Sequence, residues 1–493
     1  MGVIPPGTEL APLNPGVRPW SELADDERRL ACRFQEAFAA MLEHTDAQLG
    51  RLLDTLDELA VTDDTIIVAL SDNGASQEGL EHGLMDTFLY FNGLSQAVED
   101  GLDRLDDIGT RRSNTNYPWG WAQVGNSPGK RYKQNTHGGG VRDPLIISWP
   151  NGIDPEVTGQ TRQQFHHVSD IVPSLYEVLG IDAPDTVKGV AQQPIEGTSL
   201  AYTFTAGAED PAAVPTHKTS QYFEMQGHRA ICADGWKAVS FHRPGDHLDD
   251  DQWELYHGDE DFSEGNDLAR SEPERLERLI ELFWVEAGRY GVLPIQPSSP
   301  QLFSGHRTPG TPRDRERFVY YPPLPRVPPD AAPSLGSRCW QLRAEVERGA
   351  ADAGALLSFG TANNGLMLYI DAAGHLIYDH NAFTEHTVIR SDRPVPVGRS
   401  VLELHQDRVK RGPGRARLMI DGHQVAAGHI EMVPLMISAI GLDVGSNPSG
   451  VSDAYRAPFP FAGTISRLEI NTQRAFDPHE EAAMELLAAE RMQ

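Results

Sequence analysis

The fold of this chain is decided by Asp64-Thr-Ile-Ile-Val-Ala-Leu-Ser-Asp-Asn-Gly74, a β-branched apolar run that ends in polar turn residues. Such a run predicts a strand that is buried on both faces of a parallel sheet. In open α/β sheets, ligands bind outside the carboxyl ends of the strands. Asp72 and Asn73 therefore stand where a binding site is expected.

The residues around this run predict an α/β region. Before it, apolar residues at steps of three and four indicate one long amphipathic helix over about 21–59. Its inward positions are predicted at Phe34, Phe38, Met41, Thr45, Leu49, Leu52 and Leu56. After it, we expect a second strand over 144–149 and a helix over about 168–179 that Gly180 ends.

Residues 221–268 alternate like antiparallel strands, and a helix is expected from about 272 to 287, with Gly288 placed to end it. From Val319 onward, short strands at regular spacing favour a β-sandwich. Within it, Asp421-Gly422 predicts a two-residue hairpin turn. The predicted fold class is therefore α/β, with a small α+β part, followed by an all-β sandwich.

These patterns divide the chain into four predicted segments. They are an α/β domain over 1–215, a small antiparallel sheet with a helix over 216–298, a proline-rich linker over 299–318, and a sandwich over 319–493 that ends in a helix. Charge supports the division. Residues 1–300 hold 22 basic and 49 acidic residues, whereas residues 301–493 hold 20 and 22.

Composition excludes several classes of protein. A net charge of −29 argues against a nucleic-acid partner, since phosphate binding needs basic surface. No run of 18 apolar residues is present, so we expect no membrane span, and the first residues lack the features of a signal peptide. Three cysteines in 493 residues exclude a disulfide scaffold and fit a cytoplasmic location.

Four residues are candidates for chemistry. Asp72 and Asn73 offer hard oxygen ligands of the kind Ca²⁺ prefers, although both are also common turn residues. Lys133 is one of six lysines and precedes the triple glycine that begins at Gly138, where an ammonium could hold a sulfate or phosphate oxygen. A solvated loop lysine is the alternative. His137 is a candidate for substrate contact, or a hydrogen-bonded polar residue.

Two segments carry a resemblance to a known family. They are residues 65–74 and the stretch Tyr132-Lys133 through Gly138-Gly-Gly-Val-Arg-Asp-Pro-Leu-Ile-Ile-Ser-Trp-Pro150. Together with segments in the same order up to about residue 300, they resemble the second half of a type I, formylglycine-dependent arylsulfatase of the alkaline phosphatase superfamily. The tail resembles the concanavalin-like or laminin-G-like sandwich that follows some bacterial arylsulfatases.

The resemblance implies an alkaline-phosphatase-like fold and the hydrolysis of sulfate monoesters to an alcohol or phenol and sulfate. In that family a formylglycine, made from a cysteine in Cys-x-Pro/Ala-x-Arg, is the nucleophile, and a divalent ion, usually Ca²⁺, neutralises the sulfate oxygens. By position, Asp72 and Asn73 match metal ligands and Lys133 matches the sulfate-contacting lysine. The family commonly has a glutamate where this chain has Gly138.

The nucleophile has no counterpart in this chain. Cys32, Cys232 and Cys339 are followed by Arg-Phe-Gln-Glu, Ala-Asp-Gly-Trp and Trp-Gln-Leu-Arg, and none of these is a formylglycine motif. Three hypotheses follow. The chain is part of an arylsulfatase that is inactive alone, or a non-catalytic protein whose sandwich binds carbohydrate or another partner, or a related phosphatase or phosphodiesterase. The last is least favoured, because its usual His/Asp metal clusters are not evident.

Overall fold

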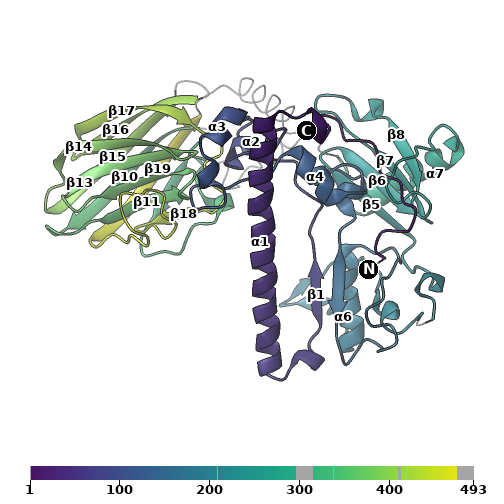
Figure 1. Ribbon diagram of the computed structural model, residues 1–493. Helices are drawn as coiled ribbons and strands as arrows, with labels where there is room; N and C mark the ends of the chain where they lie inside the picture. The colour runs from purple at the N-terminus through teal and green to yellow at the C-terminus, as the bar shows by residue number, and fades with distance from the viewer. Residues whose placement is uncertain (1, 208, 296–314, 337, 409–411, 475–493) are drawn as a thin grey trace. The chain divides into compact units, whose positions relative to one another are not determined.

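The structure is a computed structural model, and it describes residues 2–207, 209–295, 315–336, 338–408 and 412–474 (Figure 1). Residue contacts divide the chain into two compact units. The first comprises Met1–Pro19, Phe38–Gln77 and Gly120–Pro297, and the second comprises Trp20–Ala37, Glu78–Trp119 and Ser298–Gln493. Residues 299–314 of the predicted linker and the helix predicted at the end of the sandwich segment lie outside the described residues.

The units differ from the predicted segments, because two stretches from the first 215 residues group with the C-terminal part. Buried Asn92 illustrates the reason. Its Nδ2 donates to the Met436 carbonyl and its Oδ1 accepts from the Met436 amide, both at 3.0 Å. The short helices α2 (Phe88–Phe91) and α3 (Val98–Leu102) belong to this second unit. Because these contacts join residues far apart in the chain, no local sequence pattern predicts them.

The long helix α1 spans Asp25–Glu58, close to its predicted bounds (Figure 1). Acidic residues fill its first turn, where they favour the positive end of the helix dipole. Leu30 and Phe34 are buried against Met85 and Ile108. The predicted inward face is wrong over most of the helix beyond this point, because four of the later apolar side chains are exposed and Leu56 is only half-buried. Their exposed fractions are Phe38 42 %, Met41 72 %, Leu49 51 % and Leu52 56 %.

Strand β1 (Ile67–Leu70) pairs antiparallel with β2 (Leu145–Ser148), and within the described residues they form a two-stranded sheet. The expectation of a parallel strand buried on both faces is therefore wrong. Neither strand contains a buried residue. The apolar run fixed the strand, but burial depends on the elements that pack against it. Here helix α6 (Ile171–Leu179) covers one face.

Helix α6 ends as predicted. Gly180 is its C-cap and has a φ of 62°, a left-handed conformation that glycine adopts without strain. A short 3-10 turn, Val168–Asp170, precedes the helix. Two further short helices, α4 (Trp119–Asn126) and α5 (Gly138–Val141), lie on either side of the loop that carries Lys133.

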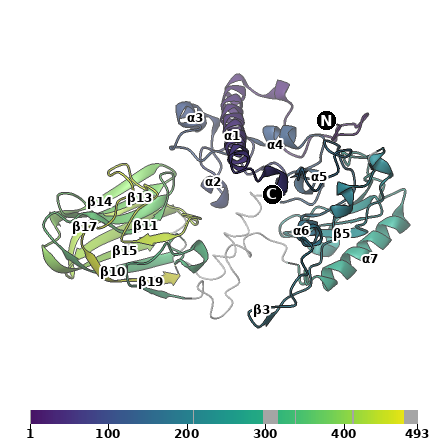
Figure 2. The same ribbon diagram turned by 90° about the horizontal axis from the view of Figure 1, so that it is seen from below.

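The predicted antiparallel strands of residues 221–268 form a four-stranded sheet in the order β5-β6-β7-β8. Their bounds are Ser220–Met225, His228–Ala233, Trp236–Ser240 and Trp253–His257. Helix α7 (Pro273–Arg289) packs on this sheet through Leu279 and Phe283 (Figure 2). Gly288 does not end α7 as predicted, because the helix continues to Arg289. A small hairpin, β3 (Thr186–Val187) with β4 (Val190–Ala191), precedes the sheet.

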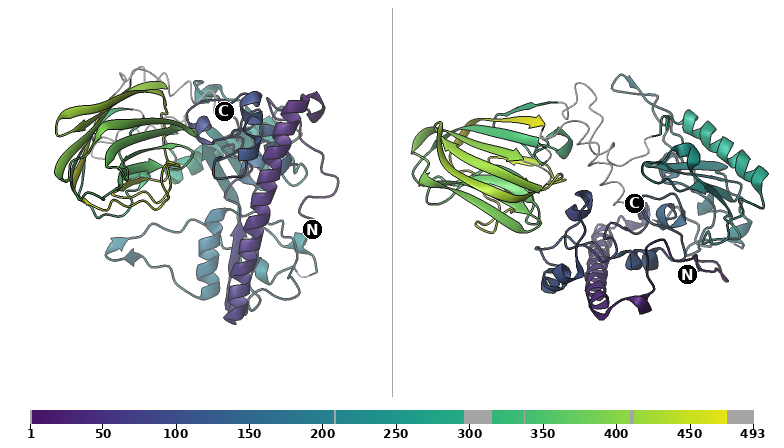
Figure 3. Two further views of the ribbon diagram at one scale, coloured as in Figure 1. Left: turned by 60° about the vertical axis from the view of Figure 1, so that its left-hand side comes forward. Right: turned by 90° about the horizontal axis from the view of Figure 1, so that it is seen from above.

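The second unit contains the predicted sandwich (Figure 3). Its two sheets have the orders β17-β16-β15-β10-β19-β9 and β14-β13-β12-β11-β18. The strands of the first are β9 Arg317–Tyr320, β10 Arg338–Arg348, β15 Gly398–Arg408, β16 Gly412–Ile420, β17 His423–Val433 and β19 Thr464–Arg474. Those of the second are β11 Gly354–Gly360, β12 Gly365–Ile370, β13 His375–Ala382, β14 Glu385–Pro394 and β18 Leu442–Val444.

One hydrophobic core lies between these sheets, with its buried residues running from Phe318 to Ile470. The Asp421-Gly422 turn joins β16 to β17 as predicted, with φ values of 50° and 78° that suit a type I′ hairpin. The order of an α/β part followed by an all-β sandwich is confirmed. In the described part of the chain, no helix is both long and apolar enough to cross a bilayer.

We expect residues 315–493 to fold without the rest of the chain, because the main sandwich core is contained within them. In that fragment, Leu404→Ala, at a fully buried position, should lower the free energy of unfolding by about 2–5 kcal/mol. Val397→Ala, at an exposed position, should change it by less than about 0.5 kcal/mol. Urea unfolding followed by circular dichroism measures both, and a fragment without a cooperative transition would contradict the expectation.

Candidate functional site

The turn after β1 presents the two predicted metal ligands. The Ser71 hydroxyl donates to the Asn73 carbonyl at 2.8 Å, and Asn73 Nδ2 donates to the Gly74 carbonyl at 3.0 Å. The Asn73 amide oxygen is thereby left available. Asp72 is exposed, and its carboxylate makes no hydrogen bond or ion pair to any described residue. Two hard oxygens thus stand at the end of this strand.

The loop that carries Lys133 is bound to this turn through backbone groups. The Lys133 amide donates to the Ala75 carbonyl at 3.1 Å, and the Gly74 amide donates to the Gly140 carbonyl at 3.4 Å. Asn126 Oδ1 accepts from the Ala75 amide at 2.7 Å. The structure therefore brings together segments that lie about sixty residues apart in the sequence, as the candidate site requires.

Asp143 is a neighbour of this turn that the sequence analysis missed. The Ser71 amide donates to the Pro144 carbonyl at 3.2 Å, which extends the β1–β2 pairing by one step and brings Asp143 near Asp72. Burial raises the pKa of Asp143 to about 6, and the Asp72 carboxylate adds to the rise. A strand pairing that brings two acidic residues together was not visible from either segment alone.

His137 lies beneath the glycine turn and is only 1 % exposed. Its Nε2 is 3.2 Å from Glu254 Oε2, which also accepts from Lys130 Nζ at 2.8 Å and from the Tyr256 hydroxyl. Burial lowers the pKa of His137 although Glu254 opposes the shift, so its imidazole is neutral near pH 7. His137 is thus held inside a polar network, and it forms the N-cap position of α5.

Glu264 is a second residue that sequence reasoning missed. Its carboxylate is 2 % exposed, accepts from the Gly138 amide at 2.9 Å and pairs with Lys237 Nζ at 2.6 Å. A Cβ at position 138 would lie 3.3 Å from Glu264 Oε1. A carboxylate from a distant segment therefore lies where the resemblance led us to expect a glutamate side chain from residue 138. Only the spatial contact reveals this.

The donors at the turn fit a divalent cation. Asp72 supplies a carboxylate and Asn73 supplies an amide oxygen, and hard oxygens are the ligands of Ca²⁺ and Mg²⁺. Ca²⁺ takes six to eight oxygens, so these two residues would fill only a small share of its coordination sphere.

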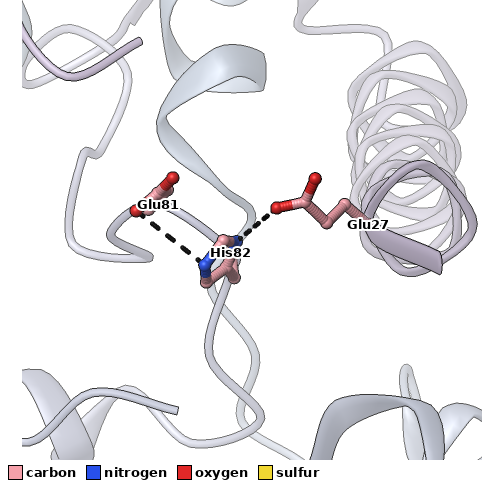
Figure 4. A group of neighbouring side chains, drawn as sticks. All are labelled: Glu27, Glu81 and His82. Atoms are coloured by element: carbon pink, nitrogen blue, oxygen red, sulfur yellow. Dashed lines mark ion pairs between the residues drawn. The ribbon is translucent and has the colours of Figure 1, made fainter. Parts of the chain in front are cut away.

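A separate group, Glu27, Glu81 and His82, lies in the second unit (Figure 4). His82 Nδ1 is 3.6 Å from Glu27 Oε1, and Nε2 is 3.8 Å from Glu81 Oε2. Each ring nitrogen thus faces a different carboxylate (Figure 4). This is the arrangement of a histidine between two acidic partners, rather than of three ligands around one ion.

Gly74 tests the contact between the turn and the glycine-rich loop. An added Cβ would lie 1.7 Å from the Gly139 carbonyl oxygen, so Gly74→Ala should destabilise the chain by about 1–3 kcal/mol. Gly120→Ala is the matched control, because open space surrounds that helical glycine, and it should stabilise by about 0.5–1 kcal/mol. The urea unfolding midpoints of the two variants measure these changes in stability. Equal changes at the two glycines would refute the close contact at Gly74.

Glu264 tests the polar network. Burial alone would raise the pKa of Glu264, but Lys237, His137 and the Gly138 amide together hold it below its ordinary value of 4.5. The ionised pair therefore stabilises the fold above pH 4.5, and this contribution is lost as the pH falls through the folded-state pKa. Glu264→Gln should cost about 3–5 kcal/mol at pH 7 and progressively less in acid.

The control for this variant is Glu260→Gln in the same loop, where the side chain is 83 % exposed and a change under about 0.5 kcal/mol is expected. Urea unfolding at pH 7 and at lower pH measures both. A loss for Glu264→Gln that stays the same at every pH would mean that the carboxylate is not ionised in the folded chain.

Part of this chain is similar in sequence to known sulfatases. The sulfatase family profile matches residues 18–181. An uncharacterized sulfatase of Schizosaccharomyces pombe is 29 % identical over 301 residues, which cover 59 % of this chain and 50 % of the relative. An arylsulfatase of Klebsiella aerogenes is 29 % identical over 183 residues, covering 37 % of each.

Among solved structures, Ps i-CgsB in complex with k-i-k-neocarrahexaose is 20 % identical and covers 58 % of this chain and 49 % of its own, with a TM-score of 0.34. The chain spans half or less of the length of the curated relatives named above. The matched residues include the α1 helix, the Asp72-Asn73 turn and the Lys133 loop. By the profile match, residues 18–181 belong to the sulfatase family.

Proposed function

We propose that this chain carries part of the active site of a sulfuric ester hydrolase of the arylsulfatase type, which cleaves sulfate monoesters to an alcohol or phenol and sulfate. One observation supports this most strongly. The backbone bond from Lys133 to Ala75 fixes a cationic segment beside the Asp72-Asn73 turn. An oxygen-ligand pair beside a loop that carries a lysine suits a dianionic, oxygen-rich group such as sulfate.

Sulfatases bind a divalent metal ion. In this chain we propose Ca²⁺ with Asp72 and Asn73 as ligands, where the ion would supply positive charge to the sulfate oxygens. Lys133 would hold another sulfate oxygen or stabilise the leaving oxygen as the ester bond breaks. We assign His137 a positioning role, since it is buried, neutral near pH 7 and hydrogen-bonded to Glu254.

The nucleophile is not supplied by any of the three cysteines. Cys32 is exposed and Cys232 and Cys339 are partly buried, and none stands in a Cys-x-Pro/Ala-x-Arg motif. Burial raises the pKa of the Cys232 thiol to about 11, so little of it is thiolate near pH 7. We therefore propose that turnover requires a nucleophile from outside this sequence.

A non-catalytic role is the second candidate, and the missing nucleophile motif favours it. In that case the sandwich would bind carbohydrate or another partner. The two candidates differ in one respect: the first needs the Lys133 loop and the Asp72 turn, whereas the second needs only the sandwich.

We expect no hydrolysis of p-nitrophenyl sulfate by residues 1–493 under saturating Ca²⁺. When the chain is combined with a segment bearing a formylglycine, turnover should appear, and Lys133→Ala should lower kcat by about 10²–10³-fold. Lys133→Arg should also lower kcat, because a planar guanidinium does not replace a compact ammonium.

Lys188→Ala, at an exposed lysine of the β3–β4 hairpin, is the control and should keep full activity. Turnover by residues 1–493 alone, abolished by a single substitution within them, would reveal an overlooked nucleophile. An active combined enzyme that tolerates Lys133→Ala would remove Lys133 from the site.

A further inference from the structure

The pairing of β1 with β2 continues beyond the ends of both strands. Leu70 lies opposite Leu145, and the Ser71 amide donates to the Pro144 carbonyl at 3.2 Å. One further step in this register would bring Asp72 opposite Asp143, and the Asp72 carboxylate lies near enough to Asp143 to help raise its pKa. Ser71 and Pro144 occupy a hydrogen-bonded position, so the next pair is a non-hydrogen-bonded one. In an antiparallel ladder, side chains approach most closely at such pairs.

No described residue neutralises this pair of acidic side chains. Neither carboxylate makes a hydrogen bond or an ion pair within the described ranges. Arg142, the nearest arginine in sequence, is engaged elsewhere, since Nη1 donates to the Phe262 carbonyl and its guanidinium lies over the Phe262 ring. Like charges directly opposite each other destabilise a strand pair. In the part of the chain that the structure describes, no cationic side chain pairs with Asp143.

The same turn offers a third oxygen. Asn73 Nδ2 is occupied by the Gly74 carbonyl, which leaves the Asn73 amide oxygen as an acceptor. Two carboxylates and one amide oxygen are suitable ligands for a hard divalent cation. The total charge of −2 on the carboxylates balances the charge of +2 on the ion.

We propose that Asp143 is a further ligand of the divalent cation at the Asp72-Asn73 turn. The proposal rests on the metal-binding part of the proposed function and not on sulfate hydrolysis. Three protein oxygens, with the remaining positions filled by water or substrate, should give weak binding. Ca²⁺ sites with few charged ligands have dissociation constants of about 10⁻⁴–10⁻³ M.

Calorimetric titration of the full chain with Ca²⁺ tests the proposal. Asp143→Asn and Asp72→Asn should each weaken Ca²⁺ binding by at least about tenfold, because each removes one of the two carboxylate charges that face the ion. Asp182→Asn, at an exposed position of the same unit, is the control and should bind like the unchanged chain. Binding that survives Asp143→Asn undiminished, or no saturable binding by the unchanged chain, would overturn the proposal.

Thermal unfolding gives a second test, because the proposal predicts the direction of the change in Tm with and without Ca²⁺. Without Ca²⁺, Asp143→Asn should raise the Tm, because it removes the repulsion from Asp72. With saturating Ca²⁺, the unchanged chain and Asp182→Asn should gain stability, whereas Asp143→Asn should not. A variant with a lowered Tm and a full Ca²⁺-dependent gain would refute the proposal. If the chain combined with a formylglycine-bearing segment hydrolysed no sulfate ester while Ca²⁺ binding still depended on Asp143, only the proposed function would be refuted.

Discussion

The site depends on one buried carboxylate, that of Glu264, which ties the glycine turn to the four-stranded sheet. It accepts from the Gly138 amide and pairs with Lys237 on β7, 126 and 27 residues away in sequence. A buried charge costs several kcal/mol unless it is paired and hydrogen-bonded, and here both conditions are met. Glu264 itself has a φ of 58°, a strained conformation for a residue other than glycine. Its surroundings hold it in this conformation.

The glycine turn transmits this constraint to the candidate site. Gly139 and Gly140 lie so close to the loop that a Cβ would be 2.2 Å from the Arg131 carbonyl and 2.1 Å from the Asn135 carbonyl. Neither has a positive φ, so close packing and not backbone conformation explains the glycines. Because the loop folds tightly on itself, the Lys133 amide can reach the Ala75 carbonyl beside the Asp72 turn. The position of Lys133 thus follows from contacts beneath it.

Local patterns predicted some elements well and others in part. The steps of three and four predicted α1 to within four residues at its start and one at its end, and the Asp421-Gly422 turn predicted the β16–β17 hairpin. The same helical pattern failed to predict burial, since Met41 is 72 % exposed. An amphipathic stripe shows which face can be buried, but burial needs a partner element. Likewise, the β1 run fixed a strand but not its neighbour, and β2 pairs with it antiparallel.

From the sequence alone we could predict several of the longer elements, the order of an α/β part before a sandwich, and four candidate residues at Asp72, Asn73, Lys133 and His137. These predictions depend on short-range periodicity and turn chemistry, which involve residues that are neighbours in the sequence. Only the tertiary structure shows that His137 contacts Glu254, that Glu264 accepts from the Gly138 amide, and that Asp143 lies near Asp72. Such pairings join residues far apart in the chain, and strand register and burial fix them only once the chain has folded.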